Sequence, residues 1–123
     1  MARYLTEEQL IAHLRLDKAV EQWLGVIKEE TYTIIKWLRI DKESASQYSV
    51  AYFECFDEGE EDFVDIYEFS QLDPDEPFGV INSFDTVEDA LKFDDTSYTA
   101  MIGKYVSAGS IQEEYLDYLE SRS

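Results

Sequence analysis

The hydrophobic residues of this chain change their spacing partway along, and this change restricts the fold more than any other feature. From Tyr32 to Ile40, β-branched and aromatic residues dominate, and Tyr32, Ile34, Leu38 and Ile40 fall on one face of an extended backbone. Alternation of this kind is typical of a β-strand with one buried face. We therefore predict a strand over about 31–40, followed by a polar turn.

Two further segments have strand character, over about 48–56 and about 62–69, and each carries large apolar residues on both faces. The polar link between them contains Gly59, which can take the positive φ of a tight hairpin. A shorter fourth strand is predicted over about 78–83, after a loop that two prolines make rigid. Strands joined by such short links pair as an antiparallel meander.

Helical patterns precede the predicted sheet. Thr6 and Gln9 are spaced as a capping box, which predicts a helix from about Glu7. Asp17 resembles a second N-cap, and Gly25 is a typical helix stop. We therefore expect two short helices, or one bent helix, over about 7–24.

Helical patterns also follow the sheet, where apolar residues return to a spacing of three and four. They predict helices over about 86–94, about 97–107 and about 111–120. The chain contains no repeat and no low-complexity linker. We predict one α+β domain over residues 1–123, an antiparallel β-meander of three to four strands packed against N-terminal and C-terminal helices.

The charge of the chain is strongly negative and unevenly placed. Its 28 acidic and 10 basic residues give a net charge of −18, yet residues 1–42 hold seven of each. Residues 43–95 hold 17 acids and a single base, Lys92. Affinity for a phosphate backbone depends on Lys and Arg, so this composition argues against direct nucleic-acid binding.

Many of these acids crowd into a predicted hairpin tip, a proline loop and a short helix. The acids of the predicted hairpin tip and of the proline loop lead us to expect a surface that binds a basic protein, because opposite charges accelerate association and favour specific pairing. A second copy of the chain is the other expected partner, because a sheet with two apolar faces needs cover. The solvated-loop interpretation of the same acids also stays open. The expected partner-binding residues are Asp57, Glu58, Glu60, Glu61, Asp62, Asp73, Asp75 and Glu76.

Three other acids interrupt apolar strands and define an alternative function. If Glu54, Asp65 and Glu68 are buried, their pKa values are perturbed and they can line a pocket between sheet and helices. Such a pocket would make the protein a small-molecule or metal-binding domain, with or without enzymatic activity. The simpler interpretation is that these acids face solvent or pair with Lys36 or Arg39 on a neighbouring strand.

The inventory of reactive side chains favours a protein without catalysis, cofactor or metal. One histidine, His13, and one cysteine, Cys55, exclude a Cys₄ or Cys₂His₂ zinc site and an intramolecular disulfide. Oxygen ligands surround Gly59, but they lack the spacing of an EF-hand. The chain has no signal-peptide pattern at its start and no apolar stretch of roughly 18 residues, so we expect a cytoplasmic protein that does not enter membranes.

Overall fold

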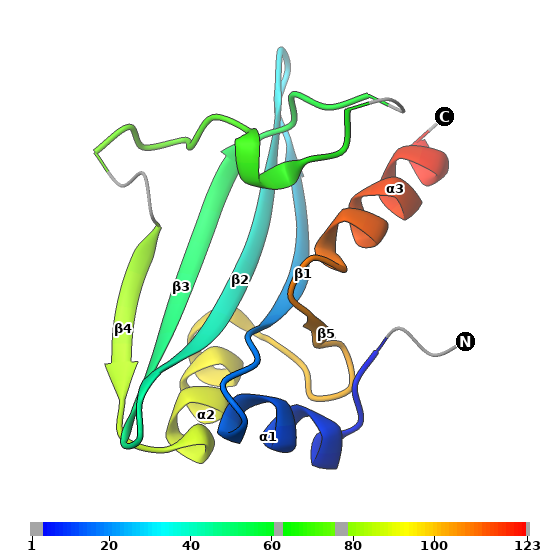
Figure 1. Ribbon diagram of the computed structural model, residues 1–123. Coiled ribbons are helices and arrows are strands. Elements are labelled where there is room, and N and C mark those ends of the chain that lie inside the picture. The colour runs from blue at the N-terminus through cyan, green and yellow to red at the C-terminus, as the bar shows by residue number, and fades with distance from the viewer. Residues whose placement is uncertain (1–3, 61–62, 76–78, 123) are drawn as a thin grey trace.

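A five-stranded antiparallel sheet forms the centre of the protein in the computed structural model, which describes residues 4–60, 63–75 and 79–122 (Figure 1). The strand order is β4-β3-β2-β1-β5, so the first four strands form a meander and β5 lies beside β1. The predicted α+β class and the flanking N-terminal and C-terminal helices are confirmed. In chain order the elements are α1 (Glu7–Arg15), β1 (Val20–Lys28), β2 (Thr33–Ser44), β3 (Gln47–Phe56), the 3₁₀ turn η1 (Ile66–Glu68), β4 (Val80–Phe84), α2 (Val87–Tyr98), β5 (Val106–Ser107) and α3 (Ile111–Arg122).

Different elements cover the two faces of the sheet. Side chains alternate along a strand, so Leu38 and Ile40 of β2 lie on one face, and Ile35 and Trp37 on the other. Helices α1 and α2 cover the first face and form a core around Leu38 and Ile40. Helix α3 and the segment between β3 and β4 cover the second face and enclose Trp37. Both faces of the central strand β2 are therefore covered by other parts of the chain.

The first helix begins where its capping residues predict. The Gln9 amide N–H donates to the Thr6 hydroxyl at 3.1 Å, and the Thr6 amide N–H donates to the Gln9 side-chain oxygen at 2.9 Å. Leu10 and Leu14 are its buried residues. Two donors that the first turn would leave without partners are thereby satisfied.

The prediction of a second N-terminal helix before Gly25 is wrong, because strand β1 occupies that segment. Asp17 has a positive φ of 62° and lies in the turn that ends α1. The apolar residues that fit helical spacing here also fit a strand once a bulge is inserted. The register with β2 shifts between Trp23 and Gly25, and Gly25 has a φ of 126°, which favours glycine.

The predicted strand over about 62–69 is also absent from the described residues 63–69. Ile66 and Phe69 are both buried in the second core, while Tyr67 and Glu68 between them are exposed. A 3₁₀ turn places residues three apart on the same side, whereas a strand would place Ile66 and Phe69 on opposite faces. Strand β4 takes the position beside β3 instead.

The predicted helix over about 97–107 does not form. Helix α2 extends to Tyr98 and ends at Thr99, which has a φ of 59°. The chain then turns, and Val106–Ser107 pairs with β1 as strand β5. The predicted helices over about 86–94 and 111–120 correspond to α2 and α3, and the strand over about 78–83 corresponds to β4 within the described residues.

Candidate functional site

All eight predicted partner-binding acids belong to one long segment, residues 57–79, which we call the acidic loop. It crosses the end of the sheet that lies away from α1 and α2 (Figure 1). Glu61, Asp62 and Glu76 lie outside the described residues. Within the described part, Glu58, Glu60, Asp73 and Asp75 are exposed, and Asp57 is half-buried.

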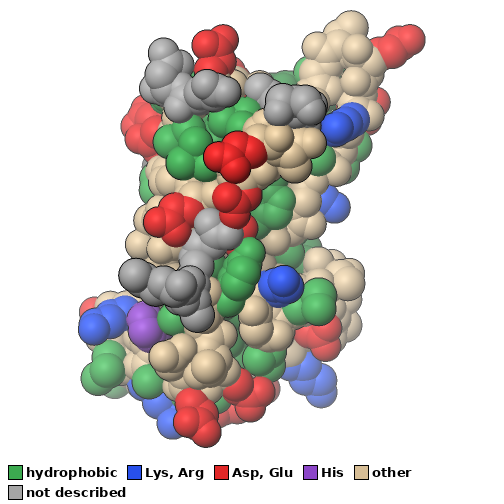
Figure 2. Space-filling view, turned by 90° about the vertical axis from the view of Figure 1, so that its right-hand side faces the viewer, with side chains coloured by type: hydrophobic (Ala, Val, Ile, Leu, Met, Phe, Trp, Pro, Cys, Tyr) green, Lys and Arg blue, Asp and Glu red, His purple; other side chains and the backbone are tan. Residues whose placement is uncertain are grey.

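The acids of α2 lie at the opposite end of the sheet from the acidic loop (Figure 1). On the face that carries α3, acidic side chains are scattered among apolar ones (Figure 2). The acidic loop and the acids of α2 are therefore two separate surfaces.

Buried aromatic residues attach the acidic loop to the protein. Phe69 packs edge-on against Tyr115 of α3, with ring centroids 5.2 Å apart. The Tyr115 hydroxyl donates to the Asp57 carboxylate at the start of the loop. A Cβ on Gly59 would lie 2.5 Å from the Phe69 ring and from the Phe63 carbonyl oxygen. The loop needs glycine at this position for close packing rather than for the positive φ expected of a hairpin.

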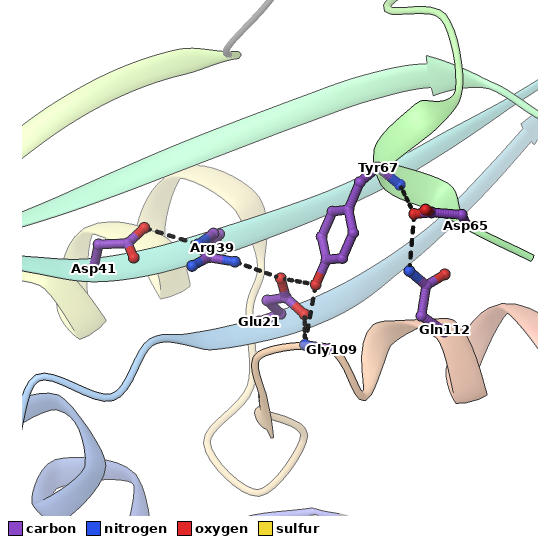
Figure 3. Close-up of polar contacts among 7 residues, drawn as sticks. All are labelled: Glu21, Arg39, Asp41, Asp65, Tyr67, Gly109 and Gln112. Atoms are coloured by element: carbon purple, nitrogen blue, oxygen red, sulfur yellow. Dashed lines mark hydrogen bonds and ion pairs between the residues drawn. The ribbon is translucent and has the colours of Figure 1, made fainter.

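A buried carboxylate on β1 ties the same loop to the sheet (Figure 3). Glu21 is fully buried and accepts hydrogen bonds from the Tyr67 hydroxyl at 2.5 Å, Arg39 Nη1 at 3.1 Å and the Gly109 amide at 3.0 Å. Burial and the bond to Glu21 raise the pKa of Tyr67, so its hydroxyl stays a donor. Three donors compensate the buried charge, which makes Glu21 a structural residue that joins the loop, two strands and the turn before α3.

One amide side chain of α3 holds the start of the 3₁₀ turn (Figure 3). Gln112 Nε2 donates to Asp65 Oδ1 at 3.1 Å, and Gln112 Oε1 accepts from the Ile66 amide at 3.0 Å. The same Asp65 oxygen accepts from the Tyr67 amide at 3.2 Å. Asp65 therefore caps the 3₁₀ turn.

The three acids of the alternative prediction are not brought together. Glu54 accepts from the Tyr52 hydroxyl at 2.8 Å and lines a cavity of only about 40 Å³ beside Asp73. Asp65 caps η1, and Glu68 is exposed. Of these three acids, only Glu54 lines that cavity.

A larger cavity, of about 580 Å³, lies between α1, α2 and the segment that follows α2. We call it the apical groove. Its apolar lining is Ile11, Leu91, Ala100, Met101, Ile102 and Tyr105, and its charged lining is Glu7, Glu88, Lys92 and Asp95. The sequence prediction missed it, because a helix over 97–107 would bury Met101 and Ile102, whose exposed fractions are 57% and 50%.

A buried acid lies behind the groove wall. Asp94 of α2 is fully buried, and its Oδ2 accepts from the hydroxyl of the groove-lining Tyr105 at 2.8 Å. Its Oδ1 has no partner among the described residues. Burial raises the pKa of Asp94 to about 7. The sequence contained a signal for it, because residue 94 continues the apolar face formed by Val87, Ala90 and Leu91.

The cysteine of the chain is buried. Cys55 is a buried free cysteine of β3, and burial raises the pKa of its thiol to about 12, so that the nucleophilic thiolate is disfavoured. In the described part of the chain, no three His, Cys, Asp or Glu side chains are grouped so that they could hold a metal ion.

None of the helices within residues 4–60, 63–75 and 79–122 has the apolar length of a membrane span.

Comparison of the chain with protein-family models, curated proteins and solved structures finds no match in any of the three.

Proposed function

We propose that this protein is a non-catalytic interaction module that binds a basic protein partner through the acidic loop. The observation that carries the proposal is the combination of exposed acids with a buried attachment. Glu60, Asp73 and Asp75 face solvent, while Ile66 and Phe69 of the same loop are buried in the second core. The loop offers its charges from a fixed position.

Such an arrangement favours binding for a physical reason. A flexible loop loses conformational freedom when a partner orders it, and this loss opposes association. Here Gln112 and Tyr115 of α3 already hold the loop, so less freedom remains to be lost. Fixed negative charges also accelerate the approach of a basic partner and select its orientation.

A second copy of the chain is the less favoured partner. Each copy carries a net charge of −18, which opposes self-association at low salt. The two apolar sheet faces that motivated a homo-oligomer are also covered by α1, α2, α3 and the acidic loop. A basic partner requires neither an uncovered face nor high salt.

The proposal is tested by removing loop charges without changing side-chain shape. The loop variant carries Glu60→Gln, Asp73→Asn and Asp75→Asn. The control removes the same number of exposed acids near α1 and α2, with Glu8→Gln, Asp85→Asn and Asp89→Asn. Fluorescence anisotropy measures the affinity of each for a labelled oligolysine peptide at several salt concentrations.

We expect the loop variant to bind the peptide about tenfold more weakly than the control, since each charge pair contributes about 0.5 kcal/mol. The two variants have the same net charge, so a difference between them locates the binding surface. Equal affinities would mean that the peptide responds to net charge alone, and the acidic loop would not be the site.

A further inference from the structure

The apical groove has the size and lining of a binding site, and nothing in the proposed function uses it. Its volume of about 580 Å³ lies within the range of ligand-binding pockets, and its lining combines a mostly apolar surface with a few charged groups. Met101 and Ile102 expose half or more of their surface beside it. Neighbouring exposed apolar residues at the mouth of a cavity mark an interaction surface.

A buried side chain fixes the exposed position of Met101. Gln22 of β1 is 2% exposed, and its amide bonds the backbone of Met101 in both directions. Gln22 Nε2 donates to the Met101 carbonyl at 3.1 Å, and the Met101 amide donates to Gln22 Oε1 at 2.9 Å. These two hydrogen bonds hold the Met101 backbone in place, so its exposed side chain is already positioned to contact a partner.

The charge of the groove rim selects for a cationic occupant. Glu7, Glu88 and Asp95 line the groove, against Lys92 as the basic lining residue. Glu88 also pairs with Arg15 at 3.2 Å, but both side chains are more than half exposed, so this ion pair is weak. The other two acids, Glu7 and Asp95, form no ion pair among the described residues.

We propose that the apical groove binds an amphipathic, basic helical segment of a protein partner. One or two apolar side chains of that segment enter the groove against Met101 and Leu91, and its Lys or Arg side chains reach Glu7 and Asp95. A helix that lays its apolar face into a hydrophobic groove is a recurrent mode of peptide recognition. This inference does not depend on the acidic loop, which lies at the other end of the sheet (Figure 1).

The test uses a matched pair of substitutions. Met101 and Ile81 are exposed to 57% and 56%, and Ile81 lies on strand β4, away from the groove lining. Met101→Lys and Ile81→Lys therefore make the same change of charge and polarity at two equally exposed positions. The probe is a short labelled peptide of leucine and lysine whose leucines recur with helical spacing, and anisotropy measures its affinity.

We expect Met101→Lys to weaken binding of this probe by about tenfold or more and Ile81→Lys by less than about twofold. A scrambled peptide of the same composition, and a peptide with glutamate in place of lysine, should both bind the unmodified protein more weakly. Met101→Leu keeps an apolar contact and should retain affinity, which separates loss of the contact from loss of folding.

Three results would overturn the proposal. Equal weakening by Met101→Lys and Ile81→Lys would show attraction to net charge alone. Equal affinity for the glutamate peptide would show selection by apolarity alone. Conversion of a dimer to a monomer by Met101→Lys in sedimentation would assign the groove to a second copy. The loop variant leaves the groove lining unchanged and should bind this probe within about twofold of the unmodified protein, so that failure of the acidic-loop proposal and failure of the groove proposal are distinguishable.

Discussion

The buried carboxyl group of Asp94 should make the protein less stable as the pH rises. Its pKa increases from an ordinary 3.8 to about 7 in the folded protein, so the native state keeps a proton that the unfolded chain has already lost. Stability is therefore highest below the unfolded pKa and falls as pH rises toward 7, after which it is constant. The full loss is about 4 kcal/mol, at 1.36 kcal/mol for each tenfold change in the proton equilibrium.

The substitution Asp94→Asn removes this effect while it keeps the shape of the side chain. The Asn oxygen can still accept from the Tyr105 hydroxyl, but the buried NH₂ group has no evident acceptor and costs about 1–3 kcal/mol. Above pH 7 the variant should therefore be more stable than the parent by about 1–3 kcal/mol. Between about pH 5.5 and about pH 7 this difference should grow by about 2 kcal/mol, because only the parent ionises.

Urea unfolding, followed by tryptophan fluorescence at about pH 5.5, 6.5, 7.5 and 8.5, measures this difference directly. Asp95→Asn is the control, because Asp95 is the exposed neighbour on the same helix and loses the same charge. A stability gain for Asp94→Asn that does not change with pH would refute the reasoning. So would equal pH dependence of the two variants.

Three further substitutions test the attachment of the acidic loop. Gly59→Ala places a Cβ within 2.5 Å of the Phe69 ring and should lower the free energy of unfolding by about 1–3 kcal/mol in urea titrations, whereas an unchanged midpoint would contradict the close packing. Gln112→Ala removes the side-chain acceptor of the Ile66 amide and the donor to Asp65, and should speed proteolytic cleavage within 63–75 while the far-ultraviolet circular dichroism stays the same. Glu21→Ala leaves Arg39 without its buried partner and should destabilise by about 3 kcal/mol in thermal unfolding, more than Glu21→Gln does; equal effects would argue against a charge contribution.

The elements that sequence reasoning found are those whose signals are local. The capping box at Thr6 and Gln9 predicted the start of α1, alternation between Tyr32 and Ile40 identified β2, and a run of large apolar residues identified β3. The antiparallel α+β class follows from these signals, because adjacent strands with short links pair with each other.

The secondary-structure predictions were wrong where a segment fits two kinds of local structure and a contact with a distant residue selects one of them. The segment before Gly25 fits a helix or a bulged strand equally well, and pairing with β2 selected the strand. Met101 fits a helical position, but Gln22, 79 residues earlier in the chain, holds its backbone in a turn. Local periodicity contains no information about such partners.

The acidic loop and the apical groove also differ in how far local sequence patterns predict them. The sequence located two groups of acids, in a predicted hairpin tip and in a proline loop, but it placed a strand between them and did not predict the single loop that holds both. Its fixed position depends on α3, and the Gln112 contact with Ile66 spans 46 residues. The apical groove exists because α1 and α2 lie side by side, as the ion pair between Arg15 and Glu88 illustrates. No pattern within either helix predicts that arrangement.

The last quarter of the chain closes both faces of the sheet, and this has a consequence for synthesis. Tyr105 completes the core under α1 and α2, while Ile111, Tyr115 and Leu119 complete the core on the other face. A ribosome that has made the meander and α2 has therefore made a sheet with neither face fully covered. A nascent chain that stalls before Ile111 lacks the cover that α3 gives the second face, and this face presents an apolar surface to chaperones and proteases.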